Sequence, residues 1–294
     1  MRIAILSNPR SGRNRAASLA SGCVSAIARR GHTPVPLTIA DPLDASIDRL
    51  IVVGGDGTVH HTLGQLVEYR IPFVHLPTGT ANLIATEFGM PRRPEESAEW
   101  AIRGGTREID IPTLDDGPFM IMVSAGADAS VIHRFEQTRS GSGGYLNYVA
   151  PVIREVIAPR PARLSFVCDG EPIDPPSPVN LTIANLKSYA LGINHCARAD
   201  PSDQLLDVRA TPCRSTIGWT IASLRARLRS NAPSSVFRRG ARVEITARDA
   251  CVLQVDGEIA RTPTMPDGVL EAGRTVLVEH TGTRIPVIER PHET

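Results

Sequence analysis

Residues 50–58 read LIVVGGDGT, and this stretch decides the fold. Its four apolar residues, 50–53, are typical of a strand that is buried on both faces of a sheet. A glycine-rich loop follows at residues 54–58, and residues 59–69 have the pattern of a helix. The sequence therefore predicts a strand–loop–helix unit of an open α/β sheet, in which ligands bind beyond the carboxyl end of the strand.

The loop of residues 54–58 is a candidate phosphate-binding site. Its glycines let backbone N–H groups approach an anion closely, Asp56 can hold Mg²⁺ or contact a nucleotide, and Thr58 can cap the following helix. The alternative is a plain strand-to-helix turn that needs a positive φ, but one glycine would suffice for that. Three glycines with an acid among them favour phosphate binding.

The segments around this loop alternate between strand and helix. Strands are predicted over residues 2–7, 34–39 and 71–76. Helices are predicted over residues 14–29, 81–88 and 95–103. This alternation is typical of a Rossmann-like α/β domain, with parallel strands and helices on both faces of the sheet.

The remainder of the chain has the pattern of an antiparallel β-domain. Strand-like segments, separated by turn residues, lie at 119–125, 163–168, 179–184, 205–210, 242–247, 251–255 and 275–280. Two helices are expected, at 145–157 and 216–228. We therefore expect an α/β domain over residues 1–111 and a β-sandwich domain over residues 112–280. The tail, 281–294, is expected to rejoin the first domain, with its last residues, RIPVIERPHET, frayed.

The composition excludes several classes of protein. The chain has 294 residues and a net charge of +1, which does not favour nucleic acid as a partner. Its five cysteines are scattered without a C-x-x-C pair, so a reducing, cytoplasmic compartment is expected. No signal peptide and no run of about 18 apolar residues is found. Lys187 is the only lysine, and the Walker and Rossmann glycine motifs are both missing.

Three further motifs each follow directly after a predicted strand, where a loop or a hairpin turn would place them at the edge of a sheet. Residues 77–82, PTGTAN, follow the next strand, which places them beside the glycine loop. Residues 8–13, NPRSGR, follow the first strand, and their two arginines suit phosphates. Residues 256–258, DGE, follow the strand 251–255. Taken singly, PTGTAN is an ordinary capped turn and Asp-Gly is common in hairpins.

Together these four motifs resemble the diacylglycerol-kinase catalytic family, whose order is N-P-x-x-G, G-G-D-G-T, P-x-G-T-x-N and D-G-E. Similar landmarks are EIDIP at 108–112, VSAGADASV at 123–131 and ADPSDQLLDV at 199–208, so the resemblance runs from Arg2 to about His280. It implies an NAD-kinase-like nucleotide lobe and a β-sandwich lipid lobe. It also implies an ATP- and Mg²⁺-dependent kinase of diacylglycerol or of a related lipid, such as a sphingoid base or phosphatidylglycerol.

The resemblance implies roles for single residues. Glu258 would be the general base toward the lipid hydroxyl, and Asp56 would assist Mg²⁺ and orient the phosphates. An auxiliary Mg²⁺ would be bound by Asp203 with Asp200, although the family's D-D-G reads Ser202-Asp203-Gln204 here. The nucleotide would be bound by Asn8, Pro9, Ser11, Gly12, Gly54, Gly55, Gly57, Thr58, Gly79, Thr80 and Asn82.

Two other functions remain open at this level. GGDG also occurs in NAD kinases and phosphofructokinases, so a kinase of a soluble metabolite is the first alternative. A nucleotide-binding protein without catalysis is the second, because the altered D-D-G segment weakens one metal site.

The expected partner is a lipid at the inner face of the membrane. Residues 214–242 contain seven arginines and no acid, and Ile217, Ile221, Leu224 and Leu228 fall on one helical face. This segment predicts either a helix packed on the core or a surface for anionic headgroups. A second copy of the chain, in a homodimer, is the other partner considered, and no nucleic acid is expected.

Overall fold

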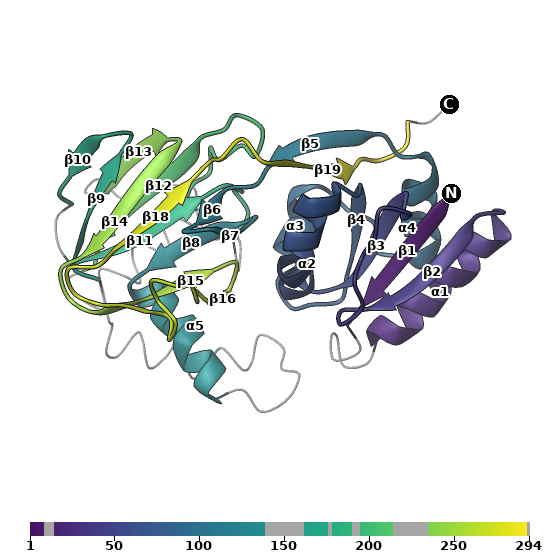
Figure 1. The fold of residues 1–294 in the computed structure, drawn as a ribbon, viewed down its shortest axis with the longest axis horizontal. Helices are drawn as coiled ribbons and strands as arrows, with labels where there is room; N and C mark the ends of the chain where they lie inside the picture. The colour runs from purple at the N-terminus through teal and green to yellow at the C-terminus, as the bar shows by residue number, and fades with distance from the viewer. Residues whose placement is uncertain (9–14, 139–161, 176–177, 190–194, 214–234, 293–294) are drawn as a thin grey trace. The chain divides into compact units, whose positions relative to one another are not determined.

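The computed structural model describes residues 1–8, 15–138, 162–175, 178–189, 195–213 and 235–292. The chain divides into two compact units. Unit 1 is Met1–Asp110 with Thr283–Thr294, and unit 2 is Ile111–Gly282. The predicted fold class is confirmed, because the first unit is α/β and the second is built on β-sheets (Figure 1).

Unit 1 is built on a six-stranded sheet in the order β2-β1-β3-β4-β19-β5. Neighbouring strands from β2 to β19 are parallel, whereas β5 is antiparallel to β19. The apolar run in β3 is buried, as its sequence predicts. The strands are β1 (Arg2–Ser7), β2 (Thr33–Thr38), β3 (Arg49–Gly54), β4 (Phe73–Pro77), β5 (Thr106–Asp110) and β19 (Arg284–Ile288).

Helices cover both faces of this sheet (Figure 1). They are α1 (Arg15–Arg29), α2 (Asp56–Tyr69), α3 (Leu83–Glu87) and α4 (Pro94–Arg103). Each strand and helix predicted for this part of the chain is present, within a few residues of its expected bounds. Because β1, β3 and β4 are parallel neighbours, the loops that follow them start from the same edge of the sheet.

The C-terminal segment corrects one expectation. Residues 284–288 do not fray, because they form β19, a strand between β4 and β5. Ile285, Val287 and Ile288 are buried, and Arg284 Nε donates to Asp110 Oδ1 at 2.7 Å. Burial of these side chains and the ion pair to Asp110 hold the segment in the sheet.

Unit 2 contains two antiparallel sheets. The first has the order β10-β9-β14-β18-β6-β7, and the second has the order β13-β12-β11-β8-β15-β16, with β17 beside β15. The first comprises β6 (Thr113–Leu114), β7 (Gly117–Pro118), β9 (Leu164–Cys168), β10 (Glu171–Ile173), β14 (Arg242–Ala247) and β18 (Thr275–Glu279). The second comprises β8 (Met122–Ala125), β11 (Val179–Ala184), β12 (Leu206–Pro212), β13 (Val236–Gly240), β15 (Cys251–Val255), β16 (Glu258–Ile259) and β17 (Val269–Leu270).

The core of unit 2 joins inward-facing residues of both sheets, such as Phe166 and Ile245 of the first and Leu181 and Leu253 of the second. In the described part of this unit, one helix, α5 (Ala127–Thr138), packs on β8, β15 and β16. No helix is predicted there from the sequence, in which residues 123–131 are identified only by their resemblance to a family motif. The helices expected at 145–157 and 216–228 lie outside the described residues.

Candidate active site

Two of the predicted loops meet in unit 1. β3 and β4 end side by side, with Gly54 opposite Pro77, and the Thr78 N–H donates to the Gly54 carbonyl oxygen at 2.7 Å. The third loop starts beside them, because the Asn8 N–H donates to the Val53 carbonyl oxygen at 3.3 Å. Pro9, Ser11 and Gly12, also expected to bind nucleotide, lie outside the described residues.

Gly55 and Gly79 lie against each other where the two loops meet. A Cβ atom on Gly79 would lie 2.7 Å from the Gly55 Cα, and one on Gly55 would lie 3.2 Å from the Gly79 Cα. No side chain fits between the loops without moving one of them. These two glycines therefore let the backbones of the two loops pack directly against each other.

Asp56 joins the glycine loop to the start of α3. Its Oδ2 accepts from the Leu83 N–H at 2.9 Å, and its Oδ1 accepts from the Ile84 N–H at 3.1 Å. Asn82, the residue before α3, makes no side-chain cap there, so Asp56 satisfies these helix N–H groups from another segment. Each oxygen of Asp56 keeps a lone pair, because a carboxylate offers about four acceptor sites.

Asn82 has an open acceptor in the same region. Its backbone is left-handed, with φ at 51°, and its Nδ2 donates to the Gly79 carbonyl oxygen at 2.8 Å. Its Oδ1 is buried and has no hydrogen-bond partner among the described residues. An amide oxygen of this kind, like the carboxylate of Asp56, is a ligand type that Mg²⁺ takes in proteins.

Thr58 does not have the capping role expected of it, and it packs against Gly54. Thr58 is 3% exposed and does not cap α2, whose N-cap is Gly55. A Cβ atom on Gly54 would overlap Thr58 Oγ1, so Gly54 is required by packing. Gly54, Gly55 and Gly57 have no positive φ, which removes the alternative of a turn that needs one. Gly57 lies in the first turn of α2, and Thr80 lies between β4 and α3.

The sequence did not single out His75, which supports the glycine loop from β4. His75 is fully buried, and its Nε2 lies 3.0 Å from the Gly54 carbonyl oxygen. Burial lowers the pKa of His75, while Asp56 and the hydrogen bond to Gly54 oppose that change. The neutral ring therefore donates to Gly54 at ordinary pH. A histidine inside an apolar strand was the available signal for this role.

The DGE motif forms a tight hairpin turn in unit 2. Val255 pairs with Glu258, and the two loop residues, Asp256 and Gly257, have φ values of 50° and 88°. These values fit a type I′ turn, which Asp-Gly favours. The Asp256 carboxylate accepts from the N–H groups of Met120, Ile121 and Met122 at 2.7–3.0 Å.

Glu258, the expected base, is the first residue after this turn and is half-buried. The three N–H groups on Asp256 fix the turn against the start of β8, and hence the backbone from which Glu258 projects. Asp56 and Glu258 belong to different units, and each is described within its own unit.

Asp200 and Asp203, which were expected to bind an auxiliary Mg²⁺, accept hydrogen bonds from their own loop. Asp200 Oδ1 accepts from the Ser202 N–H and hydroxyl at 3.0 and 2.6 Å, and Asp203 Oδ1 accepts from the Leu205 N–H at 3.0 Å. Asp203 also pairs with Arg239, whose Nε lies 3.4 Å from Asp207 Oδ2. A guanidinium thus supplies the positive charge between these two acids.

Asp207 lies beside the same guanidinium. The Asp207 side chain is fully buried, and burial raises its pKa to about 6 although Arg239 opposes the rise. Across the described ranges, no three His, Cys, Asp or Glu side chains come together as a metal site would require.

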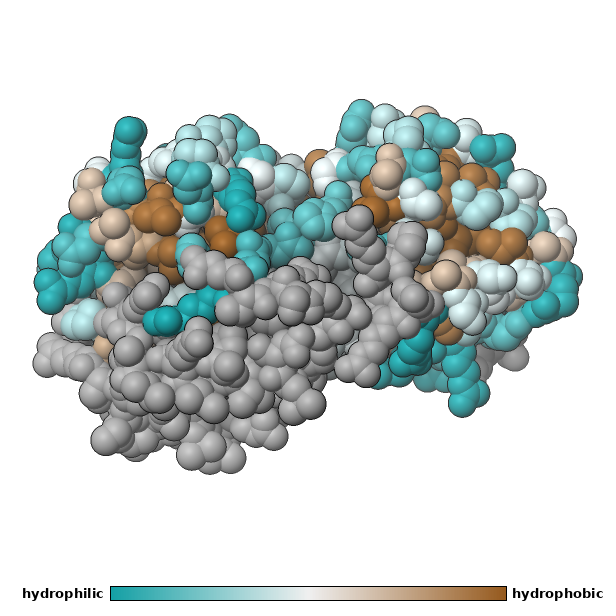
Figure 2. Space-filling model, turned by 90° about the horizontal axis from the view of Figure 1, so that it is seen from below, coloured by the Kyte–Doolittle hydropathy of each residue, from teal (hydrophilic) through white to brown (hydrophobic). Residues whose placement is uncertain are grey.

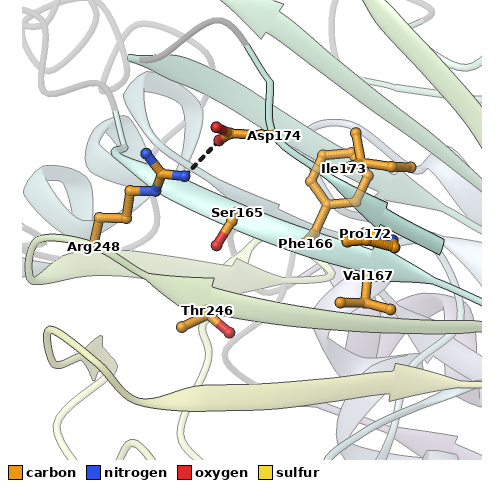
Figure 3. A pocket seen from close by; sticks show the side chains of 8 residues that line it. All are labelled: Ser165, Phe166, Val167, Pro172, Ile173, Asp174, Thr246 and Arg248. Carbon is orange, nitrogen blue, oxygen red and sulfur yellow. Dashed lines mark hydrogen bonds and ion pairs between the residues drawn. The ribbon is translucent and has the colours of Figure 1, made fainter. Parts of the chain in front are cut away.

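A pocket of about 440 Å³ lies on the first sheet of unit 2 (Figure 3). Its apolar end is formed by Phe166, Pro172 and Ile173, and the ion pair between Arg248 and Asp174, at 2.6 Å, lies at the other end. None of its residues belongs to the motifs above. The lining residues are Ser165, Phe166, Val167, Pro172, Ile173, Asp174, Thr246 and Arg248.

Most of the basic segment, for which a helix packed on the core and a surface for anionic headgroups were both considered, lies outside the described part, at residues 214–234. Its remainder carries Phe237, which is 39% exposed, and Arg242, which pairs with Glu279 at 2.9 Å. On the face drawn in Figure 2, hydrophilic residues border the hydrophobic ones in both units. Within the described residues, we find no helix whose length and apolar character would let it cross a membrane.

Comparison with known proteins gives matches over both units. Residues 2–114 match the diacylglycerol kinase catalytic domain, and residues 121–272 match the YegS C-terminal NAD kinase beta sandwich-like domain. A Mycobacterium tuberculosis protein named diacylglycerol kinase is 32% identical over 227 residues, which cover 70% of this chain and 72% of that protein. A Stenotrophomonas maltophilia protein named as a probable lipid kinase, YegS-like, is 29% identical over 75% of each chain.

Solved structures share the fold at low sequence identity. A diacylglycerol kinase from Bacillus anthracis superposes with a TM-score of 0.67 at 14% identity, over 99% of this chain and 97% of that one. An NAD kinase from Archaeoglobus fulgidus in complex with ATP has a TM-score of 0.54 at 12% identity, over 99% and 94% of the two chains.

Proposed function

Because this chain belongs to the diacylglycerol kinase family, we propose that it is an ATP-dependent lipid kinase that phosphorylates a hydroxyl group of a membrane lipid. The acceptor is diacylglycerol or a lipid with a similar exposed hydroxyl. The reaction takes place at the membrane surface, where that acceptor lies.

One observation carries the proposal: the contact between the glycine loop and the PTGTAN loop in unit 1. Gly55 and Gly79 exclude side chains from the meeting point, and Asp56 binds the start of α3 across it. A site walled by backbone and one acid suits the phosphates of a nucleotide with its Mg²⁺. In this proposal, Asp56 and Asn82 Oδ1 face that ion. When bound, Mg²⁺ neutralises charge on the transferred phosphoryl group.

Glu258 acts as the general base in this reaction. Its carboxylate takes the proton of the lipid hydroxyl, whose oxygen forms a bond to the γ-phosphorus of ATP. The bond from that phosphorus to the β–γ bridging oxygen breaks, and ADP leaves. A base must come within about 3 Å of the hydroxyl oxygen, so the rigid type I′ turn suits Glu258 to this role.

The test is transfer of labelled γ-phosphate from ATP and Mg²⁺ to a panel of lipids in mixed micelles. The panel contains diacylglycerol, a sphingoid base, ceramide and phosphatidylglycerol. Label should enter one lipid, and Glu258→Gln should lower kcat by at least about 100-fold without loss of ATP binding. Glu271→Gln, an exposed acid of the same unit, is the matched control and should keep full activity.

Two results would contradict the proposal. Full turnover in Glu258→Gln would remove the base assigned here. Label in no lipid, with ATP bound, would exclude lipid transfer, and a parallel panel of soluble acceptors that includes NAD would then identify a metabolite kinase.

A further inference from the structure

The turn that carries Glu258 is the end point of a chain of side-chain hydrogen bonds in unit 2. The Gly257 N–H donates to Gln254 Oε1 at 2.8 Å, and Gln254 Nε2 donates to Ser124 Oγ at 2.9 Å. The Ser124 hydroxyl donates to Asp128 Oδ2 at 2.5 Å. The Tyr189 hydroxyl donates to the other oxygen of Asp128. The chain thus links the turn to the first turn of α5.

The direction of each bond follows from its donor and its acceptor. The Ser124 hydroxyl donates to the Asp128 carboxylate and accepts from Gln254 Nε2. This leaves the amide oxygen of Gln254 facing the Gly257 N–H. If the side chain at position 128 were a donor, Ser124 would have to accept from it and donate to Gln254. The Gln254 NH₂ group would then face the Gly257 N–H, and two donors would oppose each other.

Burial makes the chain hard to replace by water. Ser124 and Gln254 are each 1% exposed. A buried polar group that loses its hydrogen-bond partner is not compensated for its desolvation. The loss of one hydrogen bond in this series should therefore destabilise the hairpin turn. The hydrogen bonds of this series are therefore cooperative, so the loss of one weakens the others.

The same helix holds the far side of the hairpin. Glu136, eight residues after Asp128 in the sequence, accepts from the Ile259 N–H at 3.3 Å and pairs with Arg261 at 3.2 Å. Glu258 lies between Gly257 and Ile259, so its backbone is held by Gln254 on one side and by Glu136 of α5 on the other. Asp256 adds the third anchor, because it accepts from the N–H of Met122, the first residue of β8.

We infer that Gln254, Ser124 and Asp128 are positioning residues for Glu258. Their bonds hold Gly257, and so set the place of the carboxylate that takes the proton. This inference rests on the proposed function for Glu258. A displacement of a reacting group by about 1 Å can lower turnover by about 100-fold, so such positioning matters to the rate.

The test compares Ser124→Ala and Gln254→Met with Thr182→Val. Thr182 is also 1% exposed, and it lies opposite Ser124 in the neighbouring strand, outside the chain of bonds. In the first two variants, kcat for lipid phosphorylation should fall by about 10- to 100-fold while the KM for ATP stays unchanged. Exchange of the Gly257 amide hydrogen, followed by mass spectrometry, should become faster in both. Thr182→Val should show neither change.

The exchange of the Gly257 amide hydrogen and the lipid kinase activity test this inference and the proposed function separately. Unchanged Gly257 exchange in Ser124→Ala would overturn the chain of bonds, whether or not the wild type is active. Faster exchange with wild-type kcat would overturn its positioning role. Equal losses of kcat in all three variants would also overturn it, since they indicate a general packing defect. A wild type with no lipid kinase activity would overturn the proposed function, and the positioning role with it.

Discussion

Gly79 is a residue where a single methyl group should weaken nucleotide binding. In Gly79→Ala, the new Cβ would lie 2.7 Å from the Gly55 Cα and 3.0 Å from Asn82 Oδ1, so the two loops must separate. We expect ATP affinity to fall by about 10-fold or more, which corresponds to about 1.4 kcal/mol, and stability to fall by about 1–3 kcal/mol. Calorimetric titration and urea unfolding measure the two effects.

Gly64→Ala is the control for Gly79→Ala. Gly64 lies in α2, is exposed, and has no neighbour that a Cβ atom would meet within 4 Å. Alanine there should raise stability by about 0.5–1 kcal/mol through its helix propensity and leave ATP affinity unchanged. Equal ATP affinity in both variants would show that the loop contact does not bind nucleotide.

His75 should make stability depend on pH. Because burial lowers its pKa in the folded protein, the unfolded chain binds the proton more readily. The stability that the neutral ring contributes is present above the unfolded pKa of about 6.5 and is lost as pH falls below it, by up to about 1.4 kcal/mol per pH unit. Urea unfolding between about pH 7.5 and about pH 5 measures this slope.

His75→Gln separates this effect from the loss of the hydrogen bond. A glutamine side chain can still donate to the Gly54 carbonyl oxygen but does not titrate. The slope below about pH 6.5 should therefore be smaller in the variant. An identical slope would assign the pH dependence to other groups, such as His195, whose pKa is also lowered by burial.

At the scale of elements, Arg239 attaches the edge strand β13 to the acids before and within β12. If its guanidinium supplies the charge that a metal would bring, EDTA and added Mg²⁺ should not change the Tm of the wild type. Arg239→Gln should lower stability by about 1–3 kcal/mol, because it leaves the buried Asp207 carboxylate without its cation. The estimate lies below the range for fully buried pairs, since the Arg239 side chain is 34% exposed.

Arg248→Gln is the control variant for Arg239→Gln. Arg248 pairs with Asp174, but both side chains are at least half exposed, so its loss should cost no more than about 1 kcal/mol. A fall in the wild-type Tm on addition of EDTA would show that a metal, rather than Arg239, holds this region.

At the scale of the whole molecule, the C-terminal strand should decide whether unit 1 folds. Deletion of residues 283–294 removes β19 from between β4 and β5, together with three buried apolar side chains. Each such side chain contributes about 1.5–3 kcal/mol, so the total loss of at least about 5 kcal/mol is comparable with the stability of a domain. We expect unit 1 to unfold while unit 2 stays folded, as limited proteolysis and calorimetry would show.

A shorter deletion tests the cause. Removal of residues 290–294 leaves β19 complete and should preserve the unfolding transition of unit 1. Proteolytic resistance of unit 1 in the longer deletion would mean that β19 is dispensable.

From the sequence alone, the strands, turns and helices that depend on residues close together in the chain can be predicted. An apolar run followed by glycines predicts β3 and its loop, and the Asp-Gly pair predicts the hairpin turn before Glu258. The fold class followed from the same local patterns, because the strand and helix periods depend on residues a few positions apart. The sheet position of the PTGTAN loop beside the glycine loop followed from parallel topology.

Only the tertiary structure showed how these features are held in place. The bonds from Asp56 to α3, from His75 to Gly54 and from Arg239 to Asp203 join segments that no local pattern relates. The chain from Gln254 to Asp128 and the place of β19 in its sheet are of the same kind. Their free energy arises from burial and from partners distant in the sequence, so it exists only once the chain has folded.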